Sequence, residues 1–297
     1  MKSYSYRIKQ SLCAQDTQAC CANAELYGFL LFCNTFRPDA IKIVTEHADI
    51  MQRYEKMIAG IIGKQNYTLT EASDGAKNFI LRVQGTQNIS RIVRYIGNYK
   101  ITPPLRIDFS VTEKECCMKS FLRGVFIAGG FISQPGRAYH LEIRTPHILL
   151  AEDLVRYCSE FGINLRTITR SGKKIAYLKS GEPIKDFLTV IGATDFVFDF
   201  ANVEIERELR NNINRAINCE SANLDKNIAA SRAQIKAINA LMKKGALDED
   251  RQLLDLARAR LDHPEMTLVQ LGQAMEPPLT KSGVAHRMRK IMQLAKE

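Results

Sequence analysis

A group of polar and basic residues near the C-terminus has the spacing of one helix face. The group consists of Lys281, Ser282, Gly283, His286, Arg287, Arg289 and Lys290. At about 100° per residue, most of these side chains point away from the apolar stripe of the same helix, and Arg287 lies on the flank of that stripe. Hydroxyl, imidazole, ammonium and guanidinium groups donate hydrogen bonds to base edges and phosphate oxygens. The residue types therefore predict a nucleic-acid contact.

Different roles are expected within this group. Ser282, Gly283 and His286 lie in the N-terminal part of the helix and are expected to reach base edges. The cations are expected to meet phosphates or guanine; they are Lys281, Arg287, Arg289 and Lys290. Residues 281–297 hold five cations and one carboxylate. This surplus suits DNA binding, although it is also common on solvated helices.

Two short helices joined by a stiff turn are expected to position the group. Thr267 and Gln270 form a capping-box pattern ahead of Leu268, Leu271 and Met275, which repeat at helical spacing. Pro277-Pro278 cannot continue this helix. Thr280 or Ser282 can cap the second helix, whose apolar stripe is Val284, Met288, Ile291 and Ala295. Helix, tight turn and helix with a basic outer face is the layout of a helix-turn-helix DNA reader.

The bulk properties describe an ordinary globular protein of about two domains. The chain has 297 residues, of which 45% are hydrophobic and 25% charged, and a net charge of +10. A basic surplus favours phosphate backbones or anionic membranes. No window is apolar over some eighteen residues, and residues 1–9 lack the apolar core of a signal peptide. The protein is expected to be cytoplasmic, at the nucleoid, without a membrane partner.

The eight cysteines do not have the spacing of a metal site. There is no Cys-x-x-Cys and no cluster of cysteine and histidine at zinc spacing. Cys20-Cys21 and Cys116-Cys117 are adjacent pairs, which ordinary disulfide geometry avoids. We expect small buried apolar residues, no metal and no cofactor. A phosphate-binding glycine loop and a nucleophile elbow are also missing, so no catalytic residues are predicted.

The chain repeats itself at an offset of 96 residues. Residues 20–30 correspond to 116–126, with identities at Cys20/Cys116, Cys21/Cys117, Leu26/Leu122 and Gly28/Gly124. After an N-terminal helix at 5–14, each half is expected to be α-β-β-α-β-β-α. In the first half, helices are expected at 21–33, 48–62 and 89–97. The hairpin turn is expected at 37–39, and strands after it are expected at 40–45, 67–71 and 79–84. The corresponding elements of the second half are helices at 117–129, 148–161 and 184–191, a turn at 134–136 and strands at 139–144, 164–170 and 174–179. The fold class is therefore α+β, with two units packed as a pseudo-twofold pair around their most apolar helices.

A long helical stretch follows the repeat. From Asn202 to about Lys243 there is almost no glycine or proline, and a polar row recurs at spacings of three to five residues. The row includes Asn211, Asn214, Arg215 and Asn218. It can be a solvated face or a set of helix caps, or it can contact DNA phosphate or the neighbouring domain. Whether the stretch is one helix or is broken at the asparagines is left open. A helix at 251–261 then opens the C-terminal domain, with Leu253, Leu254, Ala257 and Leu261 inward.

The helix at 117–129 carries a family resemblance. Residues Leu122–Gly130 resemble the LAGLIDADG motif of homing endonucleases, and Leu26–Asn34 resembles it more weakly. The resemblance implies that Gly124 lets the two motif helices approach closely. In the endonucleases an acidic residue before the last glycine of the motif binds the metal that cuts DNA. Gly129 and Cys33 stand at that position and cannot bind Mg²⁺. The fold is implied, and nuclease chemistry is not.

Three features together resemble the WhiA regulators of Gram-positive bacteria. They are the degenerate tandem motif with Cys116-Cys117, the run from Arg210 to Lys226, and the stretch Leu279–Ile291. The resemblance spans nearly the whole chain and implies a DNA-binding transcription factor of cell division, sporulation or chromosome segregation. It also implies a helix-turn-helix similar to the promoter-reading domain of sigma factors, and RNA polymerase or a partner regulator as partners. The domains are expected at 1–100, 101–200, 201–245 and 246–297.

The leading interpretation is a sequence-specific regulator that binds promoter or operator DNA and is not an enzyme. Two other functions are considered beside it. An active endonuclease would need metal-binding acids that Gly129 and Cys33 do not provide. In an interaction scaffold, the LAGLIDADG-like domain would bind protein and only the C-terminal domain would bind DNA. The cations of the sheet faces are fewer and more scattered than a nuclease saddle should show. They are Arg82, Arg144, Arg166, Arg170, Lys173, Lys174 and Lys179.

Overall fold

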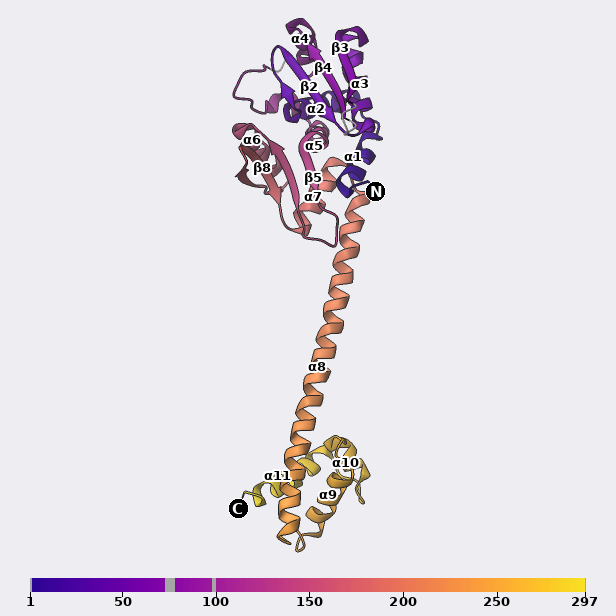
Figure 1. The fold of residues 1–297 in the computed structure, drawn as a ribbon, viewed down its shortest axis with the longest axis vertical. Coiled ribbons are helices and arrows are strands. Elements are labelled where there is room, and N and C mark those ends of the chain that lie inside the picture. Colours follow the sequence, from indigo (N-terminus) through magenta and orange to yellow (C-terminus); the bar gives the residue numbers. More distant parts are fainter. Residues whose placement is uncertain (1, 73–77, 98–99, 297) are drawn as a thin grey trace. The chain divides into compact units, whose positions relative to one another are not determined.

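The computed structural model describes residues 2–72, 78–97 and 100–296 (Figure 1). The chain divides into two compact units, Met1–Glu206 and Arg207–Glu297. The first unit is a mixed helix and strand domain with two antiparallel sheets, and the second is helical. The expected boundary between the two halves of the first unit adjoins residues 98–99, which lie outside the described part, and stays a prediction.

The first half follows an N-terminal helix, α1 (Tyr4–Cys13). Its elements are α2 (Ala19–Phe32), β1 (Thr35–Phe36), β2 (Ala40–Thr45), α3 (Ala48–Ile62), the 3₁₀ turn η1 (Lys64–Asn66), β3 (Tyr67–Ala72), β4 (Asn78–Gln84) and α4 (Thr86–Tyr95). The strands form an antiparallel sheet in the order β1-β2-β4-β3. The expected turn is confirmed, because the backbone N–H groups and carbonyls of Arg37 and Ala40 hydrogen-bond across Pro38-Asp39.

The second half repeats this arrangement after the 3₁₀ turn η2 (Phe109–Thr112). Its elements are α5 (Glu115–Gly129), β5 (Gly130–Ile132), β6 (Leu141–Thr145), α6 (Ile148–Ser159), β7 (Arg166–Arg170), β8 (Lys173–Leu178) and α7 (Gly181–Ile191). The sheet order is β5-β6-β8-β7, again antiparallel. The expected order α-β-β-α-β-β-α is therefore confirmed in both halves.

The offset between the halves is not constant. Helix α5 begins at Glu115, 96 residues after Ala19 of α2, but β6 begins at Leu141, 101 residues after Ala40 of β2. The connection between β5 and β6 is longer than its counterpart in the first half and turns at Gly136, whose φ of +92° favours glycine. Sequence alternation therefore placed the start of β6 two residues too early, at Tyr139.

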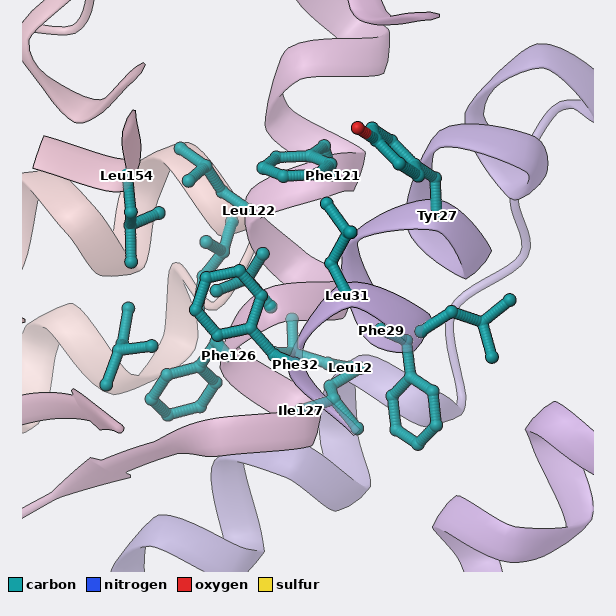
Figure 2. Packing of buried hydrophobic residues seen from close by; sticks show 14 of the residues in the cluster. Leu12, Tyr27, Phe29, Leu31, Phe32, Phe121, Leu122, Phe126, Ile127 and Leu154 are labelled. Carbon is teal, nitrogen blue, oxygen red and sulfur yellow. The ribbon is translucent and has the colours of Figure 1, made fainter. Parts of the chain in front are cut away.

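Helices α2 and α5 pack side by side and join the two halves into one hydrophobic core. Figure 2 shows Tyr27, Phe29, Leu31 and Phe32 of α2 around Phe121, Leu122, Phe126 and Ile127 of α5, with Leu12 of α1 and Leu154 of α6 alongside. All of these side chains are buried. Because both helices are apolar on almost every side, they can pack only against protein.

Two glycines permit this close approach. A Cβ atom on Gly124 would lie 2.0 Å from the carbonyl oxygen of Glu25, and one on Gly28 would lie 2.2 Å from the carbonyl oxygen of Phe121. Each blocking carbonyl belongs to the residue three positions before the glycine of the other helix, as a pseudo-twofold axis requires. The structural role expected for Gly124 is confirmed, and Gly28 has the same role.

A buried carboxylate lies beside these glycines. The side chain of Glu25 in α2 is fully buried and accepts hydrogen bonds from Arg53 at 2.6 and 2.9 Å and from the hydroxyl of Tyr54 at 3.2 Å. A guanidinium nitrogen of Arg123, from the second half, lies 3.8 Å away. Burial, followed by the charge of Glu25, raises the pKa of Tyr54 well above its ordinary value, so the hydroxyl keeps its proton. Glu25 therefore joins side chains from both halves.

The long helical stretch is one helix, α8 (Asp195–Lys243). The question left open by the asparagine row is thus resolved in favour of continuity. Glu204 near its start accepts a hydrogen bond from Lys185 of α7 at 2.8 Å. No helix in the described part of the chain combines the length and the apolar character that a bilayer span requires.

Candidate nucleic-acid interface

Three short helices form the C-terminal part of the second unit. They are α9 (Arg251–Asp262), α10 (Leu268–Ala274) and α11 (Lys281–Leu294). The capping box is confirmed: Gln270 N–H donates to Thr267 Oγ1 at 3.4 Å, and Thr267 N–H donates to Gln270 Oε1 at 2.9 Å. Of the two candidates for the cap of α11, the structure selects Thr280, whose Oγ1 accepts from Gly283 N–H at 3.2 Å.

The turn between α10 and α11 folds tightly over α10. The backbone N–H of Leu279 donates to the carbonyl of Gly272 at 2.8 Å, and a Cβ on Gly272 would lie 2.3 Å from the carbonyl oxygen of Leu279. The underlying core is shared by all three helices and the end of α8. It contains Ile238, Leu241, Leu253, Leu256, Ala257, Leu271, Met275, Val284, Met288 and Ile291. The expected inward stripe of α9 omitted Leu256, which is fully buried, and included Leu254 and Leu261, which are half-buried.

A buried arginine fixes the loop that leads into α10. Arg260 is 2% exposed and donates to the carbonyl of Met266 at 2.6 Å and to those of His263 and Pro264 at 3.5 Å. The hydroxyl of Ser231 in α8 donates to the same Pro264 carbonyl at 2.6 Å. Burial lowers the pKa of Arg260. The start of α10, and through it the angle to α11, is thus held by hydrogen bonds as well as by packing.

Ser282, His286, Arg289 and Lys290 lie on one side of α11, with Lys281 at its first position and Arg287 on the flank of the apolar stripe. Lys281, Ser282, His286, Arg289 and Lys290 are exposed, and Gly283 and Arg287 are half-buried. The stripe of Val284, Met288 and Ile291 is buried on the other side. The guanidinium Nε of Arg289 donates to its own helix at the carbonyl of Ala285, at 3.3 Å. We call the exposed set, together with Arg287, the basic face of α11.

Lys290 of the basic face pairs with a side chain outside α11. The ammonium group of Lys290 donates to Asp250 at 3.0 Å, and Asp250 also caps α9 by accepting from the backbone N–H of Leu253 at 3.2 Å. The hydrogen bond from Lys290 is the main reason that the pKa of Asp250 is lowered. Lys290 therefore ties α11 to α9, and only part of its donor capacity is left for a phosphate.

The sequence interpretation missed one residue of this surface. Gln293 is exposed, and on the helix it lies between the directions of His286 and Arg289. Its amide can both donate and accept, as base-edge recognition requires. The seven-residue spacing from His286 was the signal that could have revealed it.

Substitution of Thr280 tests whether its side chain caps α11. Replacing Thr280 with alanine removes the acceptor of Gly283 N–H and is expected to lower the free energy of unfolding of the second unit by about 1 kcal/mol. Chemical denaturation followed by circular dichroism measures this loss. Thr280→Ser keeps the oxygen and should retain most of the stability; an equal loss in both variants would contradict the cap.

The polar row of α8 is also exposed. Asn211, Asn214, Arg215 and Asn218 fall within about a quarter turn of one another, so they share one helix face. The opposite side of the helix carries exposed apolar side chains. These are Leu209, Ile213, Ile217, Leu224 and Ile228, each at least 41% exposed. The four side chains of the row can therefore contact the same partner surface.

A pocket lies where the homing endonucleases hold their metal-binding acids. It lies at the C-terminal ends of α2 and α5, and its lining includes Cys33, Gly129, Arg144, Lys9 and Lys173, with no Asp or Glu among the described lining residues. A Cβ on Gly129 would lie 2.9 Å from the carbonyl oxygen of Arg144. A longer side chain therefore could not be accommodated there without a backbone shift.

The expectation for the cysteines is only partly correct. Cys21, Cys117 and Cys158 are buried, but Cys20, Cys116 and Cys219 are exposed. The two adjacent pairs, which linear spacing kept apart, meet in one cluster because α2 and α5 begin side by side. Linear spacing along the chain does not reveal this cluster, because the fold brings the two pairs together.

Residues 118–210 match the family described as the WhiA LAGLIDADG-like domain, and residues 213–295 match the WhiA C-terminal HTH domain. A probable cell division protein WhiA of Ruminiclostridium cellulolyticum is 36% identical over 99% of this chain and 97% of its own length. The chain belongs to the WhiA family. Relatives with the same description in Alkaliphilus metalliredigens and Clostridium botulinum are 33% and 32% identical over 99% of this chain.

Solved WhiA structures have the same fold. The crystal structure of full-length WhiA from Thermatoga maritima superposes with a TM-score of 0.60 at 22% identity, covering 99% of this chain and 98% of that one. The N-terminal LAGLIDADG domain of WhiA superposes with a TM-score of 0.50 at 19% identity, over 65% of this chain and 91% of that one. The α+β class, the LAGLIDADG-like domain and the C-terminal helix-turn-helix predicted from sequence are thereby confirmed for this WhiA-family chain.

Proposed function

We propose that this chain is a sequence-specific DNA-binding transcription regulator that reads promoter or operator DNA with α11. The observation that carries the proposal is the basic face, which gathers hydroxyl, imidazole and guanidinium donors on the exposed side of the second helix of a helix-turn-helix. A helix of this kind fits the major groove, where its N-terminal residues reach base edges. The cap at Thr280 and the anchor at Arg260 hold it rigidly.

Roles within the basic face follow from position. Ser282 and His286, with Gly283 beside them, face outward near the start of α11 and are proposed to contact bases. Lys281 lies at the first helical position, where the helix dipole adds to its attraction for phosphate. Arg289 is proposed to contact guanine or phosphate, and Gln293 extends the same line toward the C-terminal end.

The large domain is proposed to lack nuclease activity. Metal-assisted cleavage of DNA needs carboxylates to hold the ion, and the pocket at Cys33 and Gly129 offers cations, a thiol and an amide instead. Incubation of the full chain with Mg²⁺ or Mn²⁺ and a library of DNA targets should give no cleavage. Specific cleavage that depends on the metal would contradict this assignment.

The sheet of the second half does not form an evenly basic saddle. Arg144, Arg166, Arg170 and Lys173 lie on one face in the register of β6, β7 and β8, together with the buried carboxylate of Glu142. Although burial disfavours its charge, hydrogen bonds from His140 and Arg144 bring the pKa of Glu142 below its ordinary value. A carboxylate on this face repels phosphate. Lys174 lies on the opposite face and Lys179 follows the end of β8.

A protein-interaction scaffold that is tethered to DNA by its C-terminal helices is the second candidate. The exposed apolar side chains of α8 favour it, because single-helix ridges of this kind bind partner helices or grooves. The names of the relatives suggest that the target genes belong to cell division, with sporulation or chromosome segregation as related processes. RNA polymerase or a partner regulator would then be recruited in the cytoplasm at the nucleoid.

Substitution of a single cation tests the role of the basic face. Arg289→Ala is expected to weaken binding to a target site by about 1–3 kcal/mol, because it removes a donor to a base or phosphate. The target comes from genome-wide mapping of bound DNA followed by footprinting, and the affinity from fluorescence anisotropy. Arg258→Ala is the matched control: it removes the same charge from the exposed side of α9. Equal affinities for the two variants would rule out a specific role for Arg289.

A further inference from the structure

Four cysteine thiols from the two halves meet where α2 and α5 begin. Cys20 and Cys21 lie in the first turn of α2, and Cys116 and Cys117 in the first turn of α5. The four sulfur atoms all lie within 4.8 Å of one another. Two of the thiols are exposed and two are buried. We call this group the four-cysteine cluster.

The spacing of the sulfur atoms suits a tetrahedral ion. Four thiolates at about 2.3 Å from a central Zn²⁺ ion lie about 3.8 Å from one another. In the cluster, the sulfur atoms of Cys20 and Cys21 are 4.0 Å apart, and no pair exceeds 4.8 Å. Contraction around an ion therefore needs shifts of about 1 Å or less, which side-chain rotation at the exposed thiols can supply.

The electrostatics of this position favour negative charge. The residues that cap the two helices, Gln18 and Lys114, make no side-chain hydrogen bond to the first turn. Backbone N–H groups of both helices are thus left for other acceptors, and two helix dipoles direct their positive ends toward the thiols. A thiolate at a helix N-terminus is stabilised by the same effect. Here two helix ends act on one cluster.

We propose that the four-cysteine cluster binds one Zn²⁺ ion, which cross-links the two halves of the LAGLIDADG-like domain at the start of their motif helices. Zn²⁺ forms four bonds to sulfur, and up to four thiol protons pass to water without any change of oxidation state. Soft thiolate ligands exclude Mg²⁺ and Ca²⁺. The site is distinct from the pocket at Cys33 and Gly129, which lies at the other ends of α2 and α5.

Binding of the ion requires the thiols to give up their protons. Metal binding should therefore release protons and weaken as the pH falls.

The test uses the full chain, purified under reducing conditions without a chelator. We expect one Zn²⁺ per chain by elemental analysis, and on exchange with Co²⁺ the absorption of a tetrahedral thiolate complex. The double variant Cys20→Ser/Cys116→Ser should bind Zn²⁺ about 100-fold more weakly or worse. Cys219→Ser is the matched control, since Cys219 is an exposed cysteine on α8, and it should keep the metal. Cys20→His replaces one ligand by another and should also keep it.

Three outcomes would overturn the proposal. The first is equal zinc content in the double variant and the wild type, with circular dichroism confirming that both are folded. The second is a wild-type chain whose cluster thiols react with a thiol reagent equally fast with and without Zn²⁺. The third is an intact mass that lacks four hydrogens under non-reducing conditions, which would reveal two disulfides instead. The zinc readout does not involve DNA, so it is independent of the proposed function.

Discussion

Gly124→Ala is expected to lower the free energy of unfolding of the first unit by about 3 kcal/mol or more. The new methyl carbon would lie 2.0 Å from the carbonyl oxygen of Glu25, 2.8 Å from the backbone nitrogen of Phe29 and 2.9 Å from the carbonyl carbon of Glu25. Backbone atoms of a buried helix cannot rotate away as a flexible side chain can, so α2 and α5 must separate. The separation would loosen the core that joins the halves. Urea denaturation followed by circular dichroism measures the loss.

Gly60→Ala is the matched control for this substitution. Gly60 lies in α3, is exposed, and a Cβ there would meet no atom within 4 Å. Alanine is the better helix former, so this variant should be more stable than the wild type by about 0.5–1 kcal/mol. A similar gain in stability for Gly124→Ala would show that α2 and α5 are not in close contact at Gly124.

Glu25→Gln is expected to lower the free energy of unfolding of the first unit by about 3–5 kcal/mol, because it leaves two largely buried guanidinium groups without their counter-charge. The amide oxygen of glutamine can accept from only one of the two Arg53 donors that bond to Glu25, and it carries no charge; Arg53 would keep its bonds to the carbonyls of Cys13 and Gln15, both at 2.9 Å. Arg123 would keep its bond to the carbonyl of Ile191 at 2.9 Å but lose the nearby negative charge. The same denaturation experiment measures the effect.

An exposed ion pair provides the comparison for Glu25. Glu115 and Lys119 form an i,i+4 pair at 2.6 Å in α5, and the side chain of Glu115 is 72% exposed. Pairs of this kind contribute little because water screens both charges. Glu115→Gln should leave the unfolding transition unchanged within error. Similar effects of the two substitutions would mean that Glu25 is solvated and does not hold the two halves together.

The parts of the fold that depend on local chemistry were predictable from the sequence. The capping box at Thr267, the stop at Pro277-Pro278 and the strand Ala40–Thr45 all depend on residues that are neighbours along the chain. The same is true of the buried stripe of α11, which is set by the helical period. The candidate interface was predictable for this reason, apart from Gln293.

Features that depend on tertiary packing could not be predicted in this way. The four-cysteine cluster exists only because α2 and α5 start side by side, and linear spacing gave no indication of it. Glu142 alternates with apolar residues as an exposed residue would, but His140 and Arg144 compensate its charge and it is buried. The continuity of α8 was undecided because the helix propensity of each asparagine costs only a few tenths of a kcal/mol.

If the basic face of α11 selects DNA by sequence, the chain must bind its target site more tightly than other DNA, and the ratio of two affinities measures this preference. The affinity of the full chain is measured for a mapped target site and for the same DNA with its bases scrambled, at one salt concentration. The wild type should prefer the target by about a thousandfold or more. Arg287→Ala/Arg289→Ala should reduce this preference by about tenfold or more while the chain stays folded. Equal affinities of the wild type for target and scrambled DNA, or an unchanged preference in the double variant, would contradict the claim.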